Sequence, residues 1–337
     1  MSESQASRHM FIISRDLAAN SQEIDRFISL AETVFLKIGL PEPIIHISRF
    51  PRDALAVIRS FKEEYPDTVT RIYAVGGDSI LFDCLNAVIG LKGIELASVP
   101  WGQEPGFISS FGDGRAQLFR DLELQATSQV ILTDVLQCGP VYALNVCTVG
   151  LESYAAFLSG RFSERLKNVT RHLPESLDRA LHKALFFFGE MATIANSTLL
   201  NQKYDLLIDG EVYSGSYCCL NISNGPCSRE NKQAAICAVP DDGLLDVVLM
   251  KSCSPARIFS MFGSYVRGRY HRYPKYITYL KAREVSISSG DPLVLQLDGE
   301  VFADTSLTVR IVPAAVSFVS AGNLPYHRRA VLAQPFL

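Results

Sequence analysis

Apolar and polar residues alternate in two different ways along this chain. Between residues 10 and 110, short apolar runs such as 10–14 and 71–75 alternate with segments such as 21–39, whose apolar positions recur at the spacing of a helix. Strands that alternate with long helices are typical of a mostly parallel sheet with helices on both faces. We therefore predict an α/β domain, a parallel sheet flanked by helices, over residues 9–128.

The pattern changes near residue 130. From there to residue 320, most apolar runs are short and are separated by turn residues, apart from a helical stretch at 162–193. Runs at such short intervals favour antiparallel pairing, so we predict a β-rich, antiparallel sandwich-like domain over residues 129–322. Two domains also suit the length of 337 residues, because single cores rarely grow beyond about 250 to 300 residues. Whether the tail, residues 323–337, returns to the first domain stays open.

Composition and charge exclude several classes of protein. A formal net charge of −3 and a pI near 6.1 give no global reason to bind nucleic acid, so we expect no nucleic-acid partner. We find neither a signal-peptide pattern nor the roughly 18 apolar residues of a membrane-spanning helix. The eight cysteines form no C-x-x-C pair, which favours free thiols in a reducing cytosol. We expect a cytoplasmic protein that meets a membrane, if at all, at the inner surface.

The stretch RIYAVGGDSILFD, residues 71–83, contains the first candidate chemistry. Its apolar run stops at Gly76, Gly77, Asp78 and Ser79, and a helix-patterned segment follows without a spacer. A turn between a strand and a helix lies at the carboxyl edge of a parallel sheet, where ligands bind, and its glycines let a phosphate approach the backbone. Asp78 would repel phosphate, so its role there would run through Mg²⁺. Taken alone, the motif is more simply a tight turn capped by an aspartate.

Further motifs follow in a fixed order. SNGP at 223–226, PDDGLLDVVLM at 240–250 and QLDGE at 296–300 each resemble an ordinary turn when taken singly. Together with the GGD turn they resemble the diacylglycerol kinase catalytic family, which includes bacterial lipid kinases and the sphingosine and ceramide kinases. The resemblance extends over residues 9–320 and implies an NAD kinase/diacylglycerol kinase-like fold.

The resemblance implies roles for two motifs that lie far apart in the chain. The family's GGDG turn falls on Gly76, Gly77 and Asp78, which would hold the phosphates of ATP and the metal. The family's DGE triplet begins at Asp298, which would be the general base, and ends at Glu300, which would support the base or the metal.

The resemblance also implies a second acidic site. In those enzymes the DDG segment carries a structural Mg²⁺, which here would use Asp242 and the carbonyl of Leu244. Asp134 matches a carboxylate in the family's network between the domains. The metal-site candidates of the chain are therefore Asp78, Asp134, Asp242 and Leu244.

The departures from the family gather at the nucleotide loops. Ser79 replaces the fourth glycine of GGDG, and the loop that begins Gly102-Gln103 lacks the family's threonine, asparagine and aspartate. The turn after the first strand offers Arg15 in place of the family's Asn-Pro-x-Ser-Gly. Either Arg15, Ser79, Gln103 and Mg²⁺ rebuild the phosphate cradle, with Gly102 beside them, or the chain has lost ATP turnover.

The leading interpretation is an ATP- and Mg²⁺-dependent kinase that phosphorylates the hydroxyl of diacylglycerol or a related lipid at a membrane surface. Two alternatives stay open: a catalytically silent lipid- or nucleotide-binding member, and a kinase of a soluble alcohol or of NAD on the same fold. A homodimer also stays open. The basic segments 161–172 and 265–283 would suit an anionic bilayer. For 161–172 we favour a solvated helix face, whereas for 265–283 a β connection and a membrane contact stay equally open. Residues 186–188, three phenylalanines, favour a domain-interface core.

Overall fold

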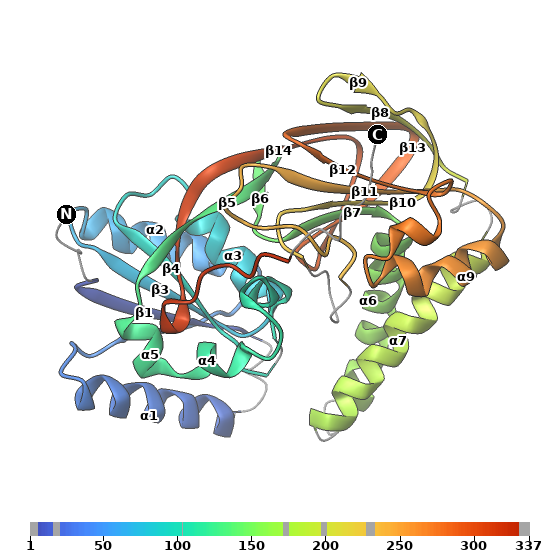
Figure 1. Cartoon of the computed structure of the whole chain (residues 1–337). Helices are drawn as coiled ribbons and strands as arrows, with labels where there is room; N and C mark the ends of the chain where they lie inside the picture. The colour runs from blue at the N-terminus through green and yellow to red at the C-terminus, as the bar shows by residue number, and fades with distance from the viewer. Residues whose placement is uncertain are drawn as a thin grey trace.

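The computed structural model describes residues 6–15, 21–102, 104–170, 175–196, 201–226 and 233–329. Figure 1 shows an N-terminal part of alternating strands and helices beside a C-terminal part that is rich in strands. The two parts share one sheet, in the strand order β12-β11-β10-β7-β13-β14-β4-β3-β1-β2.

The N-terminal part is built on four parallel strands. The strands are β1 (Arg8–Ile13), β2 (Ile44–Ile47), β3 (Thr70–Val75) and β4 (Ile94–Val99), and the pairs β1–β2, β1–β3 and β3–β4 are all parallel. All three carboxyl ends of β1, β3 and β4 therefore lie at one edge of the sheet.

Helices cover both faces of this parallel sheet. Because successive side chains of a strand point to opposite faces, Met10 and Ile12 pack with helices α2 (Asp53–Glu64) and α3 (Asp78–Val88). Phe11 and Ile13 pack on the other face with α1 (Ser21–Lys37) and α5 (Leu122–Thr127). The connection after β4 contains the 3₁₀ helix η2 (Gly106–Phe111) and the short helix α4 (Ala116–Arg120).

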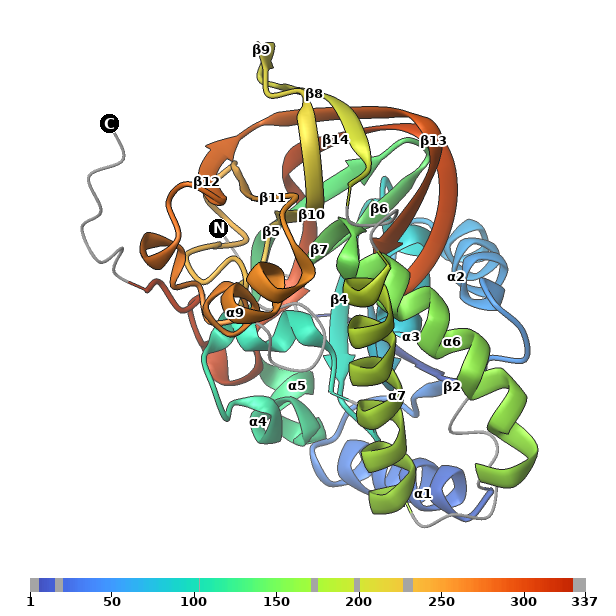
Figure 2. The same cartoon turned by 90° about the vertical axis from the view of Figure 1, so that its right-hand side faces the viewer.

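The C-terminal part is an antiparallel sheet with a helical hairpin. Its strands are β5 (Val130–Cys138), β6 (Val141–Ala143), β7 (Val146–Gly150), β8 (Lys203–Ile208), β9 (Glu211–Val212), β10 (Gly215–Ser223), β11 (Leu245–Lys251), β12 (Ile277–Ala282), β13 (Glu284–Leu297) and β14 (Glu300–Val319). Its helices are α6 (Leu151–Thr170), α7 (Glu175–Ala195), α9 (Pro255–Tyr265), η4 (Tyr270–Arg272) and η5 (Ala321–Asn323). Helices α6 and α7 lie side by side and project from the sheet (Figure 2).

Strand β14 joins the two parts. It pairs antiparallel with β13 and β5. Near its end, Ser317 and Phe318 pair parallel with β4. The tail then stays on the N-terminal part: Tyr326 is buried in its core, and the amide of His327 donates to the carbonyl of Ser110. Arg328 forms an ion pair with Asp241, so the tail also reaches the C-terminal part.

The cysteines and the hydropathy of the helices were both subjects of expectations from the sequence. The seven described cysteines are free, as expected, and five of them are buried. Among the described helices, none combines the length and the apolar character that crossing a bilayer requires.

A buried ion pair holds the parallel sheet against α5. Arg71 on β3 pairs with Glu95 on β4 at 2.7 Å, and its side chain is 3% exposed. The same guanidinium donates to the carbonyls of Gln125, Ala126 and Ser128 at the end of α5. One side chain thus satisfies a buried carboxylate and the carbonyls that the end of a helix leaves unpaired.

We predict that Arg71→Met lowers the free energy of unfolding by about 3 to 5 kcal/mol, because it leaves the Glu95 charge buried without its partner. Denaturant unfolding followed by circular dichroism measures this. The matched control is Arg310→Met, which breaks an exposed ion pair with Glu284 and should change the unfolding curve little. Equal effects of the two substitutions would contradict the structural role of Arg71.

Candidate active site between the two parts of the sheet

The glycine turn after β3 is packed against the ends of its neighbours. The amide of Gly76 donates to the carbonyl of Val99 at 3.0 Å, and Gly76 has a φ of +142°. A Cβ on Gly76 would lie 2.9 Å from the Cβ of Ser14, just after β1. Only glycine fits both that conformation and that space. Gly77 then forms the N-cap of α3, so the turn leads directly into the positive end of a helix dipole.

Asp78 connects this turn to the loop after β4. It is the first residue of α3, and its Oδ1 accepts a hydrogen bond from the amide of Gly106 at 2.8 Å. This hydrogen bond therefore fixes the loop after β4 relative to the first turn of α3. Gly102 in that loop has a φ of +81°, whereas Gln103 lies outside the described residues.

Asp298 approaches from the C-terminal part, at the hairpin between β13 and β14. Its carboxylate accepts hydrogen bonds from three successive amides, those of Leu144 at 2.5 Å, Asn145 at 3.1 and 3.2 Å, and Val146 at 2.8 Å. The residue is 7% exposed and has a φ of +45°. The hairpin is therefore fixed to the loop between β6 and β7.

The electrostatics of Asp298 are dominated by burial. Burial raises the pKa of its carboxyl to about 7; the amide of Val146 opposes this shift, and the negative charge of Asp78 adds to it. An acid with this pKa exchanges its proton at neutral pH. Asp78 and Asp298, which are 220 positions apart in the sequence, therefore lie close enough for their charges to interact.

A second contact joins the same two segments. The hydroxyl of Ser79 donates to the carboxylate of Glu300, which links the first turn of α3 to the first residue of β14. Asp83 lies one turn further along α3, and burial raises its pKa; Glu300 adds to the shift and Arg15 opposes it. Ser79 and Glu300 therefore meet where the two parts join, and Asp83 and Arg15 lie within electrostatic range of this contact or of each other.

Asp134 and the DDG segment form a separate group. Asp134 is 3% exposed and accepts hydrogen bonds from the amides of Gly243 at 2.7 Å and Ala314 at 2.8 Å. Burial raises the pKa of the Asp134 carboxyl, although both amides oppose the shift, and Asp242 raises it further. The Asp134 carboxylate on β5 thus links the DDG turn to β14 through these two hydrogen bonds.

A lysine lies where the resemblance places a structural Mg²⁺. The Nζ atom of Lys281 is 2.6 Å from Oδ2 of Asp242 and 3.1 Å from Oδ2 of the fully buried Asp246. The amide of Leu244 donates to the other oxygen of Asp242 at 3.0 Å. Burial lowers the pKa of Lys281, but the negative charges of Asp246 and Asp242 outweigh burial, so the pKa is raised.

These contacts decide where Mg²⁺ fits. The Asp242 carboxylate binds the Lys281 ammonium, so a Mg²⁺ at Asp242 would have to displace this cation. The metal role of Asp242 and of the Leu244 carbonyl stays a prediction. Within the described residues, no group of three or more His, Cys, Asp or Glu side chains could hold a metal ion. Asp78 still fits a Mg²⁺ that arrives with a nucleotide, because such an ion needs only one or two carboxylates besides the phosphate oxygens.

The SNGP motif, residues 223–226, has a structural role at this site that its sequence alone did not indicate. Asn224 is fully buried, and its Nδ2 donates to the carbonyls of Asp134 at 2.7 Å and Leu144 at 2.8 Å. A Cβ on Gly225 would lie 2.2 Å from Oδ1 of Asn145, so a larger residue would displace the loop that holds Asp298. The motif thus connects the strand of Asp134 to the amides around Asp298. Its position before a turn was the only sequence signal of this role.

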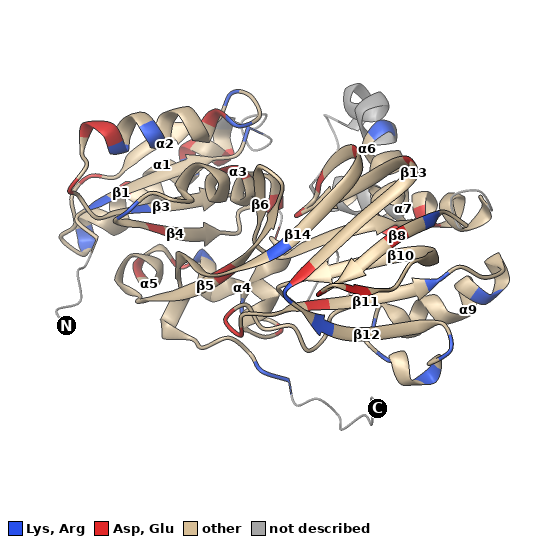
Figure 3. Ribbon diagram, turned by 90° about the horizontal axis from the view of Figure 1, so that it is seen from above, with Lys and Arg blue, Asp and Glu red and all other residues tan. Residues whose placement is uncertain are grey.

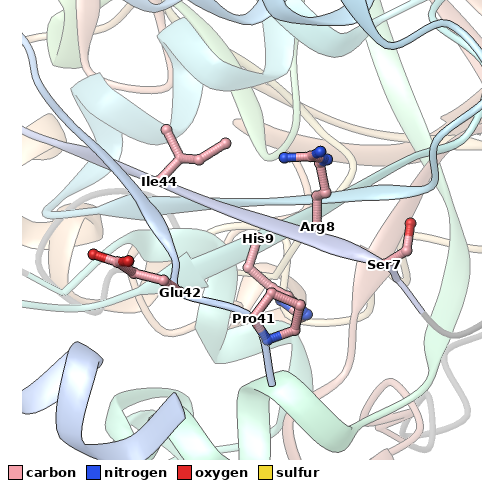
Figure 4. A pocket seen from close by; sticks show the side chains of 6 residues that line it. All are labelled: Ser7, Arg8, His9, Pro41, Glu42 and Ile44. Carbon is pink, nitrogen blue, oxygen red and sulfur yellow. The ribbon is translucent and has the colours of Figure 1, made fainter. Parts of the chain in front are cut away.

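A small pocket lies away from this site. It has a volume of about 200 Å³ and is lined by Ser7, Arg8, His9, Pro41, Glu42 and Ile44 (Figure 4). Burial, with a further contribution from Arg71, lowers the pKa of His9 to about 4, so its ring is neutral. The pocket borders the start of β1, at the edge opposite the glycine turn, and we assign it no part in the site.

Comparison with known proteins agrees with this architecture. Residues 169–320 match the family described as the YegS C-terminal NAD kinase beta sandwich-like domain. A protein of Staphylococcus aureus strain JH9 with the name "Putative lipid kinase" is 22% identical over 288 residues, which cover 83% of this chain and 87% of that protein. A Staphylococcus epidermidis protein of the same description is 21% identical over 289 residues, covering 82% and 85%.

A solved structure shows the fold. The crystal structure of a "putative diacylglycerol kinase" from Bacillus anthracis strain Sterne matches with a TM-score of 0.70 and 18% identity, over 94% of this chain and 96% of that one. The similarity covers both parts of the sheet, including the β-rich C-terminal part that the sequence pattern predicted.

We predict that Lys281→Met lowers the free energy of unfolding by about 3 kcal/mol or more, because it leaves the buried Asp246 carboxylate without its cation, with only the hydroxyl of Tyr279 still donating to it. Millimolar Mg²⁺ should then restore part of the loss by replacing the ammonium, whereas the melting temperature of the unsubstituted protein should respond neither to Mg²⁺ nor to EDTA. Differential scanning calorimetry measures both. Lys37→Met, which removes an exposed ion pair with Glu123, is the control. A fall in the unsubstituted protein's melting temperature on adding EDTA would show that the site holds a metal.

Proposed function

Because this chain is related in sequence and fold to the diacylglycerol kinase-like lipid kinases, we propose that it transfers the γ-phosphoryl group of ATP to the hydroxyl of diacylglycerol or a related lipid. The observation that carries the proposal is the hydrogen bond between Ser79 and Glu300, which brings the turn of Asp78 against the hairpin of Asp298 from the two parts of the sheet. A carboxylate for the metal-bound nucleotide then faces a carboxylate for the acceptor hydroxyl.

Asp298 is the proposed general base. Its pKa of about 7 lets it accept a proton at neutral pH while the acceptor oxygen attacks the γ-phosphorus. Three amides hold the carboxylate in one orientation, and the Asn145 amide is shared between both oxygens at 3.1 and 3.2 Å. This longer, shared contact is the one that a substrate hydroxyl would replace, because the amides of Leu144 and Val146 bind closer.

The nucleotide side is assigned to the glycine turn and α3. The turn admits a phosphate close to the backbone, and the N-terminus of α3 favours its negative charge. Asp78 fixes the loop at Gly106 and would hold Mg²⁺, which, when bound, neutralises charge on the phosphates. Arg15 follows β1, and its positive charge acts on the carboxylate of Asp83 on α3. Glu300 orients Ser79 through the hydrogen bond between them.

One observation favours the silent alternative. The Ser79–Glu300 hydrogen bond joins the two parts of the protein at the position where the family it resembles has a glycine. A phosphate that reaches the N-terminus of α3 must compete with Glu300 for this hydroxyl. If the contact never opens, the protein would bind lipid or nucleotide without transferring phosphate.

One assay separates the candidates. The protein is incubated with γ-labelled ATP and Mg²⁺ and a panel of detergent-dispersed lipids, soluble alcohols and NAD, beside a nucleotide-induced thermal shift. Label on a lipid supports the proposal. A thermal shift without label on any acceptor supports the silent protein, and label on NAD or an alcohol alone supports a soluble acceptor.

We predict that Asp298→Asn abolishes phosphoryl transfer, because the amide cannot accept the proton. In the unsubstituted protein, kcat/KM should rise with pH up to about 7 and then level off, since the base works only when ionised and burial has raised its pKa to about 7. Initial rates between pH 5 and 9 measure this. Asp304→Asn, at an exposed position of β14, should leave the profile unchanged. An undiminished rate in Asp298→Asn removes this residue from the mechanism.

We predict that Ser79→Gly tightens nucleotide binding by about tenfold, the equivalent of one hydrogen bond to a charged group that no longer competes with phosphate. Isothermal titration calorimetry with a non-hydrolysable ATP analogue measures the dissociation constant. Weaker binding in this variant would show instead that the hydroxyl is part of the cradle.

A further inference from the structure

The charges of the chain are unevenly distributed. Residues 247–283 contain eight lysines and arginines and no aspartate or glutamate, although the whole chain has a net charge of −3. Two of the eight, Lys281 and Arg283, lie near the DDG segment or at the start of β13, and Lys251 ends β11. The other five lie on α9 and on the segment that follows it.

These five side chains are exposed and form the basic surface, which we define as Arg257, Arg267, Arg269, Arg272 and Lys275. In the described parts of the chain, none of them forms an ion pair with a carboxylate; the ion pairs found there involve other cations. Figure 3 shows the basic positions on α9 and on the loops beside it. Their charge is therefore available to an external anion.

An exposed aromatic residue lies on α9, the helix that carries Arg257 and ends just before Arg267. Phe259 on α9 is 62% exposed. Gly263 lies one turn further along the same face of α9, and its carbonyl accepts a hydrogen bond from Nη1 of Arg267 at 2.8 Å. A Cβ on Gly263 would lie 3.3 Å from that nitrogen, so the absence of a side chain lets the guanidinium rest on the helix. The guanidinium of Arg267 is thereby held at Gly263, one helical turn from Phe259.

The segment after α9 is attached to the same surface. The guanidinium of Arg257 lies 5.7 Å from the centre of the Tyr276 ring, and the hydroxyl of Tyr273 donates to the carbonyl of Ser260 at 3.3 Å. The basic side chains of 267–275 thus belong to one structural unit with α9.

Further aromatic side chains come from α7, which packs against α9 (Figure 2). Phe187 is 53% exposed and Phe188 is 66% exposed. The sequence favoured a domain-interface core for residues 186–188, and for these two side chains that interpretation is wrong, because α7 projects from the sheet and presents them outward. The side chain of Phe186 lies outside the described residues.

We propose that the basic surface, together with Phe259, docks the protein on a lipid bilayer that carries anionic headgroups. Arginine and lysine side chains near such a surface each contribute about 1 kcal/mol, and an aromatic side chain among them can enter the interface. Duplex DNA would bind the cations through its phosphates but has no apolar layer that an exposed phenylalanine could enter. The inference deepens the proposed function, since it says how the protein reaches a lipid substrate.

Vesicle flotation at low salt and without ATP tests the docking. The unsubstituted protein should float with vesicles of phosphatidylcholine and phosphatidylglycerol, should not float with phosphatidylcholine alone, and should be released by high salt. The double variant Arg257→Glu/Arg267→Glu should lose at least about 30-fold in partitioning, because removing two cations alone has that effect. Phe259→Ser should weaken binding without changing its salt dependence.

A matched control carries the same charge change elsewhere. Arg26→Glu/Arg59→Glu alters exposed positions of α1 and α2 and should float as the unsubstituted protein does. Thermal melts confirm that each variant is folded. Equal losses in both double variants would mean that only net charge matters and would overturn the proposal. A second outcome would also overturn it: the unsubstituted protein binds short duplex DNA but not the anionic vesicles, and Arg257→Glu/Arg267→Glu loses the DNA binding.

The docking surface and the proposed function fail independently. Flotation without label on any lipid leaves the docking surface in place and rejects the kinase. Transfer of label to detergent-dispersed lipid by a protein that does not float with anionic vesicles rejects the docking surface alone.

Discussion

Hydrogen bonds from backbone amides to two buried carboxylates fix the loops of the C-terminal part that border the N-terminal part. Asp298 accepts from Leu144, Asn145 and Val146, and Asp134 accepts from the amides of Gly243 and Ala314. A buried carboxylate is costly unless it is hydrogen-bonded, so each of these groups fixes the segments that supply its donors. The β13–β14 hairpin, the loop before β7 and the DDG turn all take their positions from these contacts.

The same contacts set the chemistry of the interface. Burial raises the pKa of both carboxyls, so the folded state favours their protonated forms. For Asp298, stability falls as pH rises from the ordinary value near 4 towards 7, because over this range the unfolded chain releases the proton and the folded one retains it. A carboxyl kept at the expense of stability, and facing Asp78, is typical of a functional site.

Charge is balanced differently in the two acidic groups. Around Asp242 and Asp246 the protein supplies a cation, the ammonium of Lys281. Around Asp298 the carboxylate is held by backbone amides, and the positive charge of Arg15 acts on Asp83. The first group is suited to holding strands β11 and β12 together, and the second to receiving a cation with its ligand.

The sequence by itself determined the local features. The Gly76-Gly77-Asp78 turn, the alternation of strands and helices before residue 128, the β-rich remainder and the relation to the diacylglycerol kinase-like lipid kinases all follow from short patterns or from their order, and the fold and the comparisons agree with them. Such features depend on neighbours within a few residues, so the chain's pattern is enough to find them.

Only the tertiary structure decided which distant residues meet. Ser79 contacts Glu300 across 221 positions, Lys281 reaches Asp242 across 39, and Asp298 is buried by a loop more than 150 positions earlier. The exposure of Phe187 and Phe188 likewise depends on where α7 projects. Burial and long-range contacts set the pKa of Asp298 and the fit of a metal at Asp242, and these are properties of the packed chain that no local pattern contains.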